Sequence, residues 1–271
     1  MLNTSKAIKV LAEGLCFPEG PAFAADGSLW IVELKGESLI QYQDNKFKRF
    51  LVGGKPNGIA INAGGEIWFC DAGNNTIRKF HPDTEIAETI VEHVNNEVLF
   101  GPNDLAFDNK GNLLFTCPGN SRQEPTGYIC VLQANGLLKK ITVGKYFPNG
   151  LAFRDDGKIL IYAETYRHRL WIADWNDKTC ELSNERVWCN IGGPPGPGGP
   201  DGMAFHPDGN LYVAVFGTWK IKVVNTHGSV INEILLPGMN PTNCAFNLQD
   251  ELHLIVTEAE RGELLSLTGF E

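Results

Sequence analysis

Short runs of alternating hydrophobic and polar residues, separated by turn residues, extend along the whole chain. In one such unit, Leu151 and Phe153 precede a turn and Leu160 follows it. Alternation with a period of two residues is typical of half-buried β-strands. Pairs such as Asp26-Gly27 fit the turns between them, because a tight hairpin needs positive φ and glycine accepts it without steric cost. The pattern therefore predicts a series of antiparallel hairpins.

A proline-led phrase precedes each of these hairpins. Its six copies are Pro18-Glu19-Gly20, Pro56-Asn57-Gly58, Pro102-Asn103-Asp104, Pro148-Asn149-Gly150, Pro200-Asp201-Gly202 and Pro241-Thr242-Asn243. Successive prolines are separated by 38, 46, 46, 52 and 41 residues, and a unit of this length is typical of one four-stranded propeller blade. A β-sandwich with coincidental turns is the alternative, but six copies in register disfavour it.

The two ends of the chain complete this arrangement. Residues 7–12 precede the first phrase and belong to no complete unit, whereas the last unit ends at residues 263–268 and lacks one strand. We expect the N-terminal strand to pair into the last blade, which would close the ring and remove exposed edges. The sequence thus predicts an all-β fold: a single domain over residues 1–271 that forms a six-bladed β-propeller of four-stranded antiparallel blades.

Composition narrows the range of partners. The formal net charge is −9 and no basic patch is visible, so we expect no nucleic-acid partner. No segment approaches the roughly 18 apolar residues of a membrane helix, and the N-terminus lacks the hydrophobic region of a secretory signal. The seven cysteines form no CxxC pair, which indicates free thiols and a cytoplasmic location. We expect a monomer or a weak homo-oligomer.

The second letter of the phrase carries the candidate chemistry. In order, these residues are Glu19, Asn57, Asn103, Asn149, Asp201 and Thr242. Each immediately precedes the first, innermost strand of its blade, so we expect a ring of oxygen atoms that faces the central channel. Neighbouring carboxylates repel unless they are protonated or bridged by a cation, and hard divalent ions take such oxygen ligands. The ring predicts a cation site, although Asn and Asp also suit turns for structural reasons alone.

A second set of acidic residues is expected on the same face. The second strand of each blade returns antiparallel to the first, so its end should lie near the ring. The residues at these ends are Glu33, Asp71, Cys117 and Glu164. We expect a rim that supports the ring or forms its mouth, with solvated loop residues as the alternative. Cys117 has no basic or histidine partner nearby in the sequence to make it reactive.

The sequence gives little support for other catalytic mechanisms. The chain has no GxSxG, HExxH, P-loop or GxGxxG motif. Its six histidines share no register with the ring, which disfavours a histidine zinc site.

Several motifs together resemble the SMP-30/gluconolactonase/regucalcin family over residues 13–268. They are FPEGPAF, GPNDLAFDNKGNLLFT, FPNGLAF, AETYRHRLW, GPDGMAFHPDGNLYVA and NPTNCAF with VTEA. The resemblance implies a six-bladed propeller that holds one divalent cation, with Glu19, Asn149 and Asp201 as ligands. It also implies that Asn103 contacts the water or the substrate and that Asp201 is the general base.

The activity implied by this resemblance is hydrolysis of a small-molecule lactone, such as a sugar lactone. Asp201 would take the proton of the attacking water, and Asn103 would donate its amide N–H to the developing oxyanion. Ca²⁺ is the expected ion, with Zn²⁺, Mn²⁺ and Mg²⁺ as alternatives. Two other functions stay open: a phosphotriesterase-like organophosphate hydrolase, and a calcium-binding or ligand-binding propeller without turnover.

The chain departs from the family pattern beside the third phrase. Sugar lactonases of the family carry an arginine in the loop before it, but residues 97–101 contain none. We expect Arg122, from the loop after the next strand, to take its place. Phe100 should make the mouth more apolar, which weakens the case for a simple gluconolactone. Asn57 and Asn103 complete the expected substrate residues.

Overall fold

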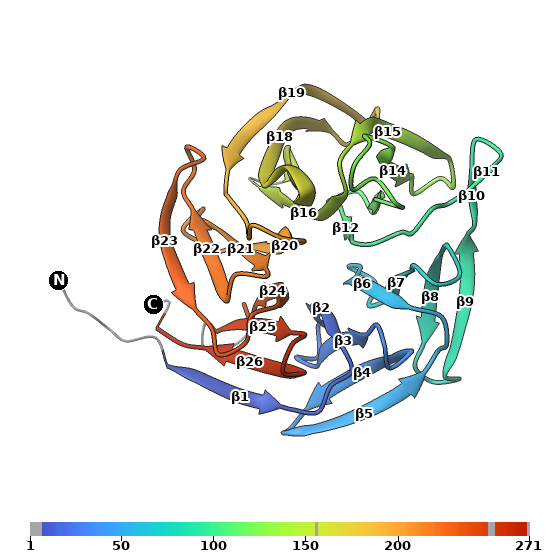
Figure 1. Cartoon of the computed structure of the whole chain (residues 1–271). Coiled ribbons are helices and arrows are strands. Elements are labelled where there is room, and N and C mark those ends of the chain that lie inside the picture. Colours follow the sequence, from blue (N-terminus) through green and yellow to red (C-terminus); the bar gives the residue numbers. More distant parts are fainter. Residues whose placement is uncertain (1–6, 155–156, 249–252, 270–271) are drawn as a thin grey trace.

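Each repeat of the sequence forms one antiparallel four-stranded sheet, and six such sheets surround a central axis (Figure 1). The protein is described from a computed structural model over residues 7–154, 157–248 and 253–269. Within the first five blades the strands follow chain order from the axis outward, because short hairpins join antiparallel neighbours. The predicted all-β, six-bladed architecture is confirmed.

The strands of the first three blades are as follows. Blade one contains β2 (Pro18–Phe23), β3 (Leu29–Glu33), β4 (Ser38–Gln43) and β5 (Lys46–Leu51). Blade two contains β6 (Pro56–Ile61), β7 (Ile67–Asp71), β8 (Thr76–His81) and β9 (Ile86–Val91). Blade three contains β12 (Leu105–Phe107), β13 (Leu113–Cys117), β14 (Gly127–Leu132) and β15 (Leu138–Lys145). A small hairpin of β10 (His93–Val94) and β11 (Glu97–Val98) lies between blades two and three in sequence.

The remaining blades repeat the arrangement. Blade four contains β16 (Pro148–Arg154), β17 (Ile159–Glu164), β18 (Arg169–Asn176) and β19 (Glu181–Asn190), with the 3₁₀ turn η2 (Thr165–Arg167) between β17 and β18. Blade five contains β20 (Gly199–Phe205), β21 (Leu211–Phe216), β22 (Lys220–Val224) and β23 (Val230–Leu235). Blade six contains β24 (Pro241–Phe246), β25 (Leu254–Glu258), β26 (Glu263–Leu267) and β1 (Ile8–Ala12).

The hairpin turns have the geometry that their residues predict. Gly27 and Gly209 adopt φ of 84° and 88°, a region that glycine enters without the steric cost of a Cβ atom. These turns fix the register in which hydrophobic residues reach both faces of each blade.

The ring closes through the two ends of the chain. Strand β1 pairs antiparallel with β26, with Ile8 opposite Leu267 and Val10 opposite Leu265. The first and last strands of the chain consequently lie side by side in blade six (Figure 1). The predicted pairing of the N-terminal strand into the last blade is confirmed, and it supplies that blade with its fourth strand.

Hydrophobic packing occurs mainly between blades. Six buried clusters are present among the described residues, one at each junction of neighbouring blades. At the junction of blades one and two, Trp30 stacks on Phe50 and both rings contact Phe80, with centroid separations of 5.0 to 5.9 Å. Aromatic pairs in these geometries add to the stabilisation from burial alone. The junctions hold the blades, and hence the central residues, in fixed positions.

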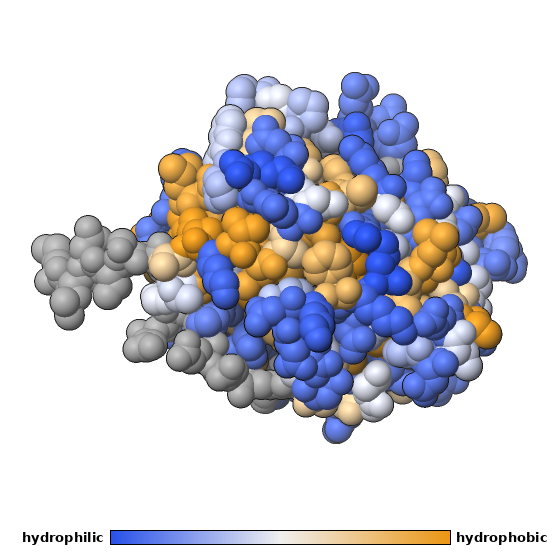
Figure 2. Space-filling model, turned by 90° about the horizontal axis from the view of Figure 1, so that it is seen from below, coloured by the Kyte–Doolittle hydropathy of each residue, from blue (hydrophilic) through white to orange (hydrophobic). Residues whose placement is uncertain are grey.

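The outer strands are more open to solvent. Ile8 and Val10 of β1 and Phe47 and Leu51 of β5 are exposed. The view from this side shows hydrophobic residues interspersed with hydrophilic ones (Figure 2). No helix in the described ranges is long and apolar enough to cross a membrane. All seven cysteines are free, as the sequence predicts.

Candidate functional site

The proline-led phrases lie at one end of the innermost strands, and most of them coincide with a β-bulge. In β2, Glu19 lies opposite Val32, but Ala22 lies opposite Trp30, so the register shifts between these pairs. Equivalent shifts occur in β6, β16, β20 and β24. A bulge disrupts the ladder locally and redirects side chains. Five of the phrases therefore belong to the strand itself, whereas in blade three the phrase precedes β12.

The phrases of neighbouring blades contact one another around the axis. The backbone N–H of Gly58 donates to the carbonyl of Asn103 at 2.6 Å. A Cβ atom added to Gly150 would lie 2.2 Å from the carbonyl oxygen of Asp201, closer than side-chain atoms approach. Glycine follows the ring residue in most blades because the next blade's backbone occupies the space of a side chain.

Five of the six predicted ring residues line one central cavity. They are Glu19, Asn57, Asn103, Asn149 and Asp201. The cavity has a volume of about 320 Å³, enough for a small organic molecule. Residues far apart in the sequence are thus brought together at one end of the channel, as the repeat predicts.

The sixth ring residue has a different place. Thr242 is fully buried, and its hydroxyl contacts the carbonyl of Pro18 at 2.8 Å and the hydroxyl of Thr257 at the same distance. It also hydrogen-bonds with the carboxyl group of Glu19, which opposes the rise in that group's pKa. Thr242 therefore links blade six to blade one and helps to hold the carboxyl group of Glu19 in position.

Two carboxyl groups line the cavity, and neither forms an ion pair with a basic residue in the part of the chain that the structure describes. Burial raises the pKa of Glu19 well above its usual value, and the neighbouring charges of Asp201 and Asp104 raise it further. Burial and the charge of Asp104 likewise raise the pKa of Asp201, against hydrogen bonds from Asn149 and Gly202. Buried like charges are costly unless a proton or a cation neutralises them. The site accordingly favours a bound positive charge.

The amide groups of the ring differ in their partners. The Nδ2 atom of Asn149 donates to Thr165 Oγ1 at 3.2 Å, and the Thr165 hydroxyl donates to the carbonyl of Pro200 at 2.7 Å. The side chains of Asn57 and Asn103 make no hydrogen bond with any residue in the described ranges. They are available to a ligand, whereas Asn149 is held in place.

Sequence reasoning missed a second level of the channel. The third letter of the phrase is glycine in four blades, but it is Asp104 in blade three and Asn243 in blade six. These two buried side chains hydrogen-bond with each other and fill the space above Gly58 and Gly202. Burial raises the pKa of Asp104 to about 7. The sequence does contain a signal for this second level, since two of the six equivalent positions are not glycine.

The acidic residues at the ends of the second strands do not form a rim. These residues are all buried, with at most 1% of their surface exposed, so they form neither the mouth of the site nor solvated loops. They are Glu33, Asp71, Glu164 and Glu258. Each accepts a hydrogen bond from a backbone N–H just before the proline of its own blade; the donors are Cys16, Lys55, Tyr146 and Asn240. None of the four carboxylates lines the central cavity. They fasten the loop that leads into each innermost strand.

Blade three achieves the same fastening without a carboxylate. Cys117 occupies the equivalent position and is buried. The hydroxyl of Tyr128 instead accepts a hydrogen bond from the backbone N–H of Phe100 at 3.1 Å. Cys117 is a packed core residue beside Tyr128 and Cys130.

The two other predicted substrate residues lie in different places. Arg122 lines the central cavity, which agrees with its expected approach to the ring. Phe100 is 55% exposed and does not line the cavity; it packs over the backbone of Gly119 on the neighbouring loop. Its role toward a substrate stays a prediction.

Aromatic residues that were not predicted from the sequence form part of the cavity wall. Phe17 and Phe147 precede the prolines of blades one and four and line the cavity. Their φ angles are 61° and 60°, a left-handed conformation that is uncommon for bulky residues and clusters at functional sites. The fastening of both loops by Glu33 and Glu164 holds this strained backbone in place.

The donor set fits a hard divalent cation. Two carboxylates and the amide groups of the asparagines converge on one cavity, where burial and neighbouring carboxylates raise the pKa of Glu19 and of Asp201. Calcium and magnesium take oxygen ligands of these kinds. No compact group of three or more His, Cys, Asp or Glu ligands occurs in the described part of the chain, so amide oxygens would have to complete the coordination.

Comparison with known proteins identifies the class. The family model of the SMP-30/gluconolactonase/LRE-like region matches residues 17–260. The chain belongs to this family, as its motifs indicate.

Named relatives fall into two activity groups. The chain is 30% identical to the diisopropyl-fluorophosphatase of Loligo vulgaris, covering 89% of this chain and 85% of that protein. It is 28% identical to the lactonase drp35 of Staphylococcus haemolyticus, covering 85% of this chain and 73% of that protein. A gluconolactonase of Xanthomonas campestris has the same fold, with a TM-score of 0.86 at 23% identity over 98% of this chain and 90% of the other.

Proposed function

We propose that this protein is a divalent-cation-dependent hydrolase that opens a lactone by attack of water, with Asp201 as general base. Lactonase relatives and membership of the family support the reaction class. The observation that carries the proposal is the convergence of Glu19, Asn149 and Asp201 on one cavity, where the two carboxylates form no ion pair with a basic residue of the described chain.

Glu19, Asn149 and Asp201 would hold the ion, and Ca²⁺ suits an all-oxygen site of this kind better than Zn²⁺, Mn²⁺ or Mg²⁺. When bound, such an ion polarises a carbonyl oxygen and makes water a stronger nucleophile. Hydrogen bonding to Thr165 orients the Asn149 side chain. The contact of Thr242 with Glu19 fixes the ligand from blade one.

Asp201 is placed to act as a proton acceptor. Its carboxyl group lies in the cavity wall, and burial raises its pKa above the ordinary value, which makes the carboxylate a stronger base. The proton taken from the attacking water would reside on a carboxylate oxygen of Asp201 and then pass to the ring oxygen, as the bond between that oxygen and the acyl carbon breaks.

Asn103 is the candidate oxyanion donor. Its side-chain amide lines the cavity and has no competing hydrogen bond within the described residues. A donor that is already in position stabilises the charge that develops on the carbonyl oxygen without reorganisation. Asn57, which is equally unengaged, would bind a polar atom of the substrate beside it.

A second activity has a specific observation in its favour. The relative with 30% identity over most of both chains is named diisopropyl-fluorophosphatase. The same general constellation, an oxygen-ligated cation with an apolar wall, would suit attack at phosphorus. A propeller that binds calcium or a ligand without turnover is the third possibility.

The setting of the reaction follows from composition. We propose a cytoplasmic protein, since all seven cysteines are free, that acts on small molecules as a monomer or weak homo-oligomer. The formal charge of −9 opposes binding to nucleic acid.

The deciding experiment is hydrolysis of a panel of sugar and aliphatic lactones and of organophosphate esters, followed with a pH indicator. Protein treated with a chelator would be assayed alone and after addition of Ca²⁺, Zn²⁺, Mn²⁺ or Mg²⁺ singly. We expect cation-dependent lactone hydrolysis that is lost in Asp201→Asn and kept in the matched variant Asp71→Asn. Turnover of the phosphorus esters alone would establish the second activity instead, and cation binding without any turnover would establish a binding protein.

A further inference from the structure

We propose that the substrate of this site is a hydroxyl-poor lactone that carries an apolar group and a carboxylate, and that Arg122 binds the carboxylate. This inference rests on the proposed lactonase function and adds the substrate class. It differs from the expectation of a sugar lactone.

Two aromatic pairs form much of the wall above the ring. Phe17 stacks on Phe216 with centroids 6.2 Å apart, and Phe147 meets Tyr166 edge-on at 5.3 Å. All four residues line the cavity, together with Leu34 and Pro197. Such a wall gains free energy when it covers apolar surface of a ligand. It offers little to a ring that bears a hydroxyl group on most of its carbons.

Few polar side chains remain for substrate hydroxyls. Outside the ring, the polar residues that line the cavity are Arg122, Thr165 and Tyr166. The Thr165 hydroxyl already donates to the Pro200 carbonyl and accepts from Asn149. A polyhydroxylated substrate would lose hydrogen bonds to water without replacing them, which is unfavourable. The distribution of polar groups therefore selects against a sugar lactone.

Arg122 supplies the positive charge of the wall. Its guanidinium carbon lies 5.7 Å from the Phe147 ring centroid and 5.5 Å from that of Tyr166. These cation–π contacts hold the group against the wall while leaving its N–H donors available. No carboxylate lies within ion-pair distance of Arg122 in the described part of the chain. A carboxylate on the substrate is the matching partner, because guanidinium and carboxylate groups pair in a bidentate manner.

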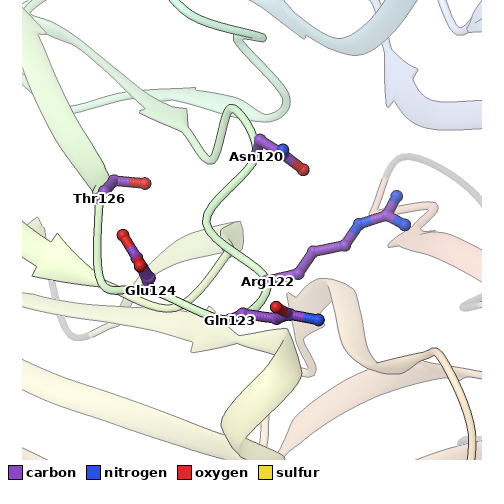
Figure 3. A pocket seen from close by; sticks show the side chains of 5 residues that line it. All are labelled: Asn120, Arg122, Gln123, Glu124 and Thr126. Atoms are coloured by element: carbon purple, nitrogen blue, oxygen red, sulfur yellow. The ribbon is translucent and has the colours of Figure 1, made fainter.

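The loop that carries Arg122 directs it away from its acidic neighbour. Asn120, Arg122, Gln123, Glu124 and Thr126 surround a pocket under this loop. In the close view, the Arg122 side chain extends away from Glu124 and Thr126 (Figure 3). Arg122 is also one of the residues that line the central cavity. Its charge is therefore directed toward the candidate active site.

A second cation lies beside another aromatic residue of the cavity wall. The Nζ atom of Lys35 lies 4.9 Å from the centroid of Phe17, and no carboxylate of the described ranges pairs with it. The protein as a whole is acidic, with a formal charge of −9. Unpaired cations at both aromatic walls would favour approach of an anionic substrate in spite of that charge.

Binding of non-hydrolysable analogues tests the carboxylate directly. The probes are cyclopentanones in which CH₂ replaces the ring oxygen of a γ-lactone and an alkyl chain ends in a carboxylate or, as the neutral match, in a carboxamide. Calorimetry on calcium-loaded protein should show about tenfold tighter binding of the carboxylate, because an ion pair at a partly exposed site contributes modestly. Arg122→Gln should remove that preference without weakening the carboxamide. Arg186→Gln, on the outermost strand β19, is the matched control and should keep the preference.

The corresponding lactones separate this inference from the function on which it rests. We expect KM for the carboxylate lactone to rise in Arg122→Gln while kcat and the KM of the amide stay unchanged. Lactone turnover without preference for the carboxylate, or with D-glucono-δ-lactone as the best substrate, would overturn this inference and leave the proposed lactonase standing. Arg122-dependent binding of the carboxylate analogue with no lactone turned over would overturn the proposed function and support the anion site.

Discussion

Two sets of acidic residues occur in the repeats, 14 residues apart where one blade carries both (Glu19 and Glu33), and they differ in their partners. Glu33 and Asp71 end the second strands of blades one and two, while Glu19 and Asp201 face the central cavity. All are acidic residues at the same end of the propeller. The first pair is surrounded by donors, and the second pair is surrounded by other acids.

Asp71 illustrates the saturated environment. Its Oδ1 atom accepts from the backbone N–H groups of Lys55, Gly73 and Asn74 at 2.9 to 3.0 Å, and its Oδ2 atom pairs with Arg78 at 3.0 Å. For Glu33, burial acts to raise the pKa, but hydrogen bonds from Arg49, Ser38 and Cys16 outweigh it and lower the pKa. Such groups stabilise the fold in the ionised state.

Glu19 and Asp201 illustrate the opposite environment. Burial and neighbouring carboxylates raise both pKa values, and the few hydrogen bonds to these groups do not compensate. This comparison indicates that burial alone does not give the role of an acidic residue. The number and the charge of its partners distinguish the two sets. Functional carboxylates are those that the protein leaves uncompensated.

The same isosteric substitution should therefore act differently in the two sets, and its largest effect is expected at the ring. Asp201→Asn would remove a proposed cation ligand and the proposed general base together. We expect turnover to fall by at least about 10²–10⁴-fold, with weaker cation binding by calorimetry. A folded variant that retained full turnover would remove Asp201 from the reaction.

Asn103→Ala should separate cation binding from catalysis. The Asn103 amide is proposed to donate to the oxyanion, and loss of such a donor typically costs about 2.7–4 kcal/mol in the barrier. We expect kcat to fall by roughly 10²–10³-fold while the Kd of Ca²⁺ stays close to the wild-type value. Equal loss of calcium binding in this variant would contradict the division between ligands and oxyanion donor.

Asp71→Asn should affect stability and leave the chemistry intact. The substitution replaces an acceptor of several N–H groups and leaves Arg78, which is 13% exposed, without its carboxylate. We expect a loss of about 2 kcal/mol in the free energy of unfolding, measured by urea denaturation. The Kd of Ca²⁺ and the kcat of folded protein should stay unchanged. Loss of turnover without loss of stability would place Asp71 in the active site after all.

The repeat explains why so much of this fold could be predicted from sequence. A phrase that recurs in register gives the number of blades, and the unpaired ends of the chain give the closure between β1 and β26. The ring of residues around the channel could also be predicted, since equivalent residues of a propeller must occupy equivalent positions around its axis. Glu19 and Asp201, residues of different blades, were thereby assigned to one site.

Other features depended on side-chain packing that repeat position does not encode. Glu33 and Asp71 could not be separated from functional acids by their spacing, because the arginines that pair with them lie on other strands of the same blade, β5 and β8. Phe100 and Phe147 both lie just before a phrase, yet only Phe147 lines the cavity. Whether such a side chain reaches the cavity depends on the direction of its loop. That direction depends in turn on the hydrogen bonds that hold the loop.

The pH dependence of the free energy of unfolding is the most sensitive test of whether the ring carboxylates lack a compensating charge. A carboxyl group with a higher pKa in the folded than in the unfolded protein binds more protons when folded, so stability falls as pH rises between the two values. For Asp104 this window runs from its ordinary value up to about 7, and the raised pKa values of Glu19 and Asp201 act in the same direction. In the presence of a chelator, lowering the pH from about 8 to about 6 should raise the free energy of unfolding by about 1 kcal/mol or more.

Calcium should reverse this trend, because protons compete with the ion for Glu19 and Asp201, so the loaded protein should lose stability as the pH falls. Asp104→Asn should reduce the slope seen in chelator. Glu33 has a lowered pKa, so its contribution is lost only at pH values below this window and does not obscure the measurement. Chelated protein whose urea midpoint did not change between these pH values would show that the ring carboxylates are compensated, and the distinction between the two sets of acids would fail.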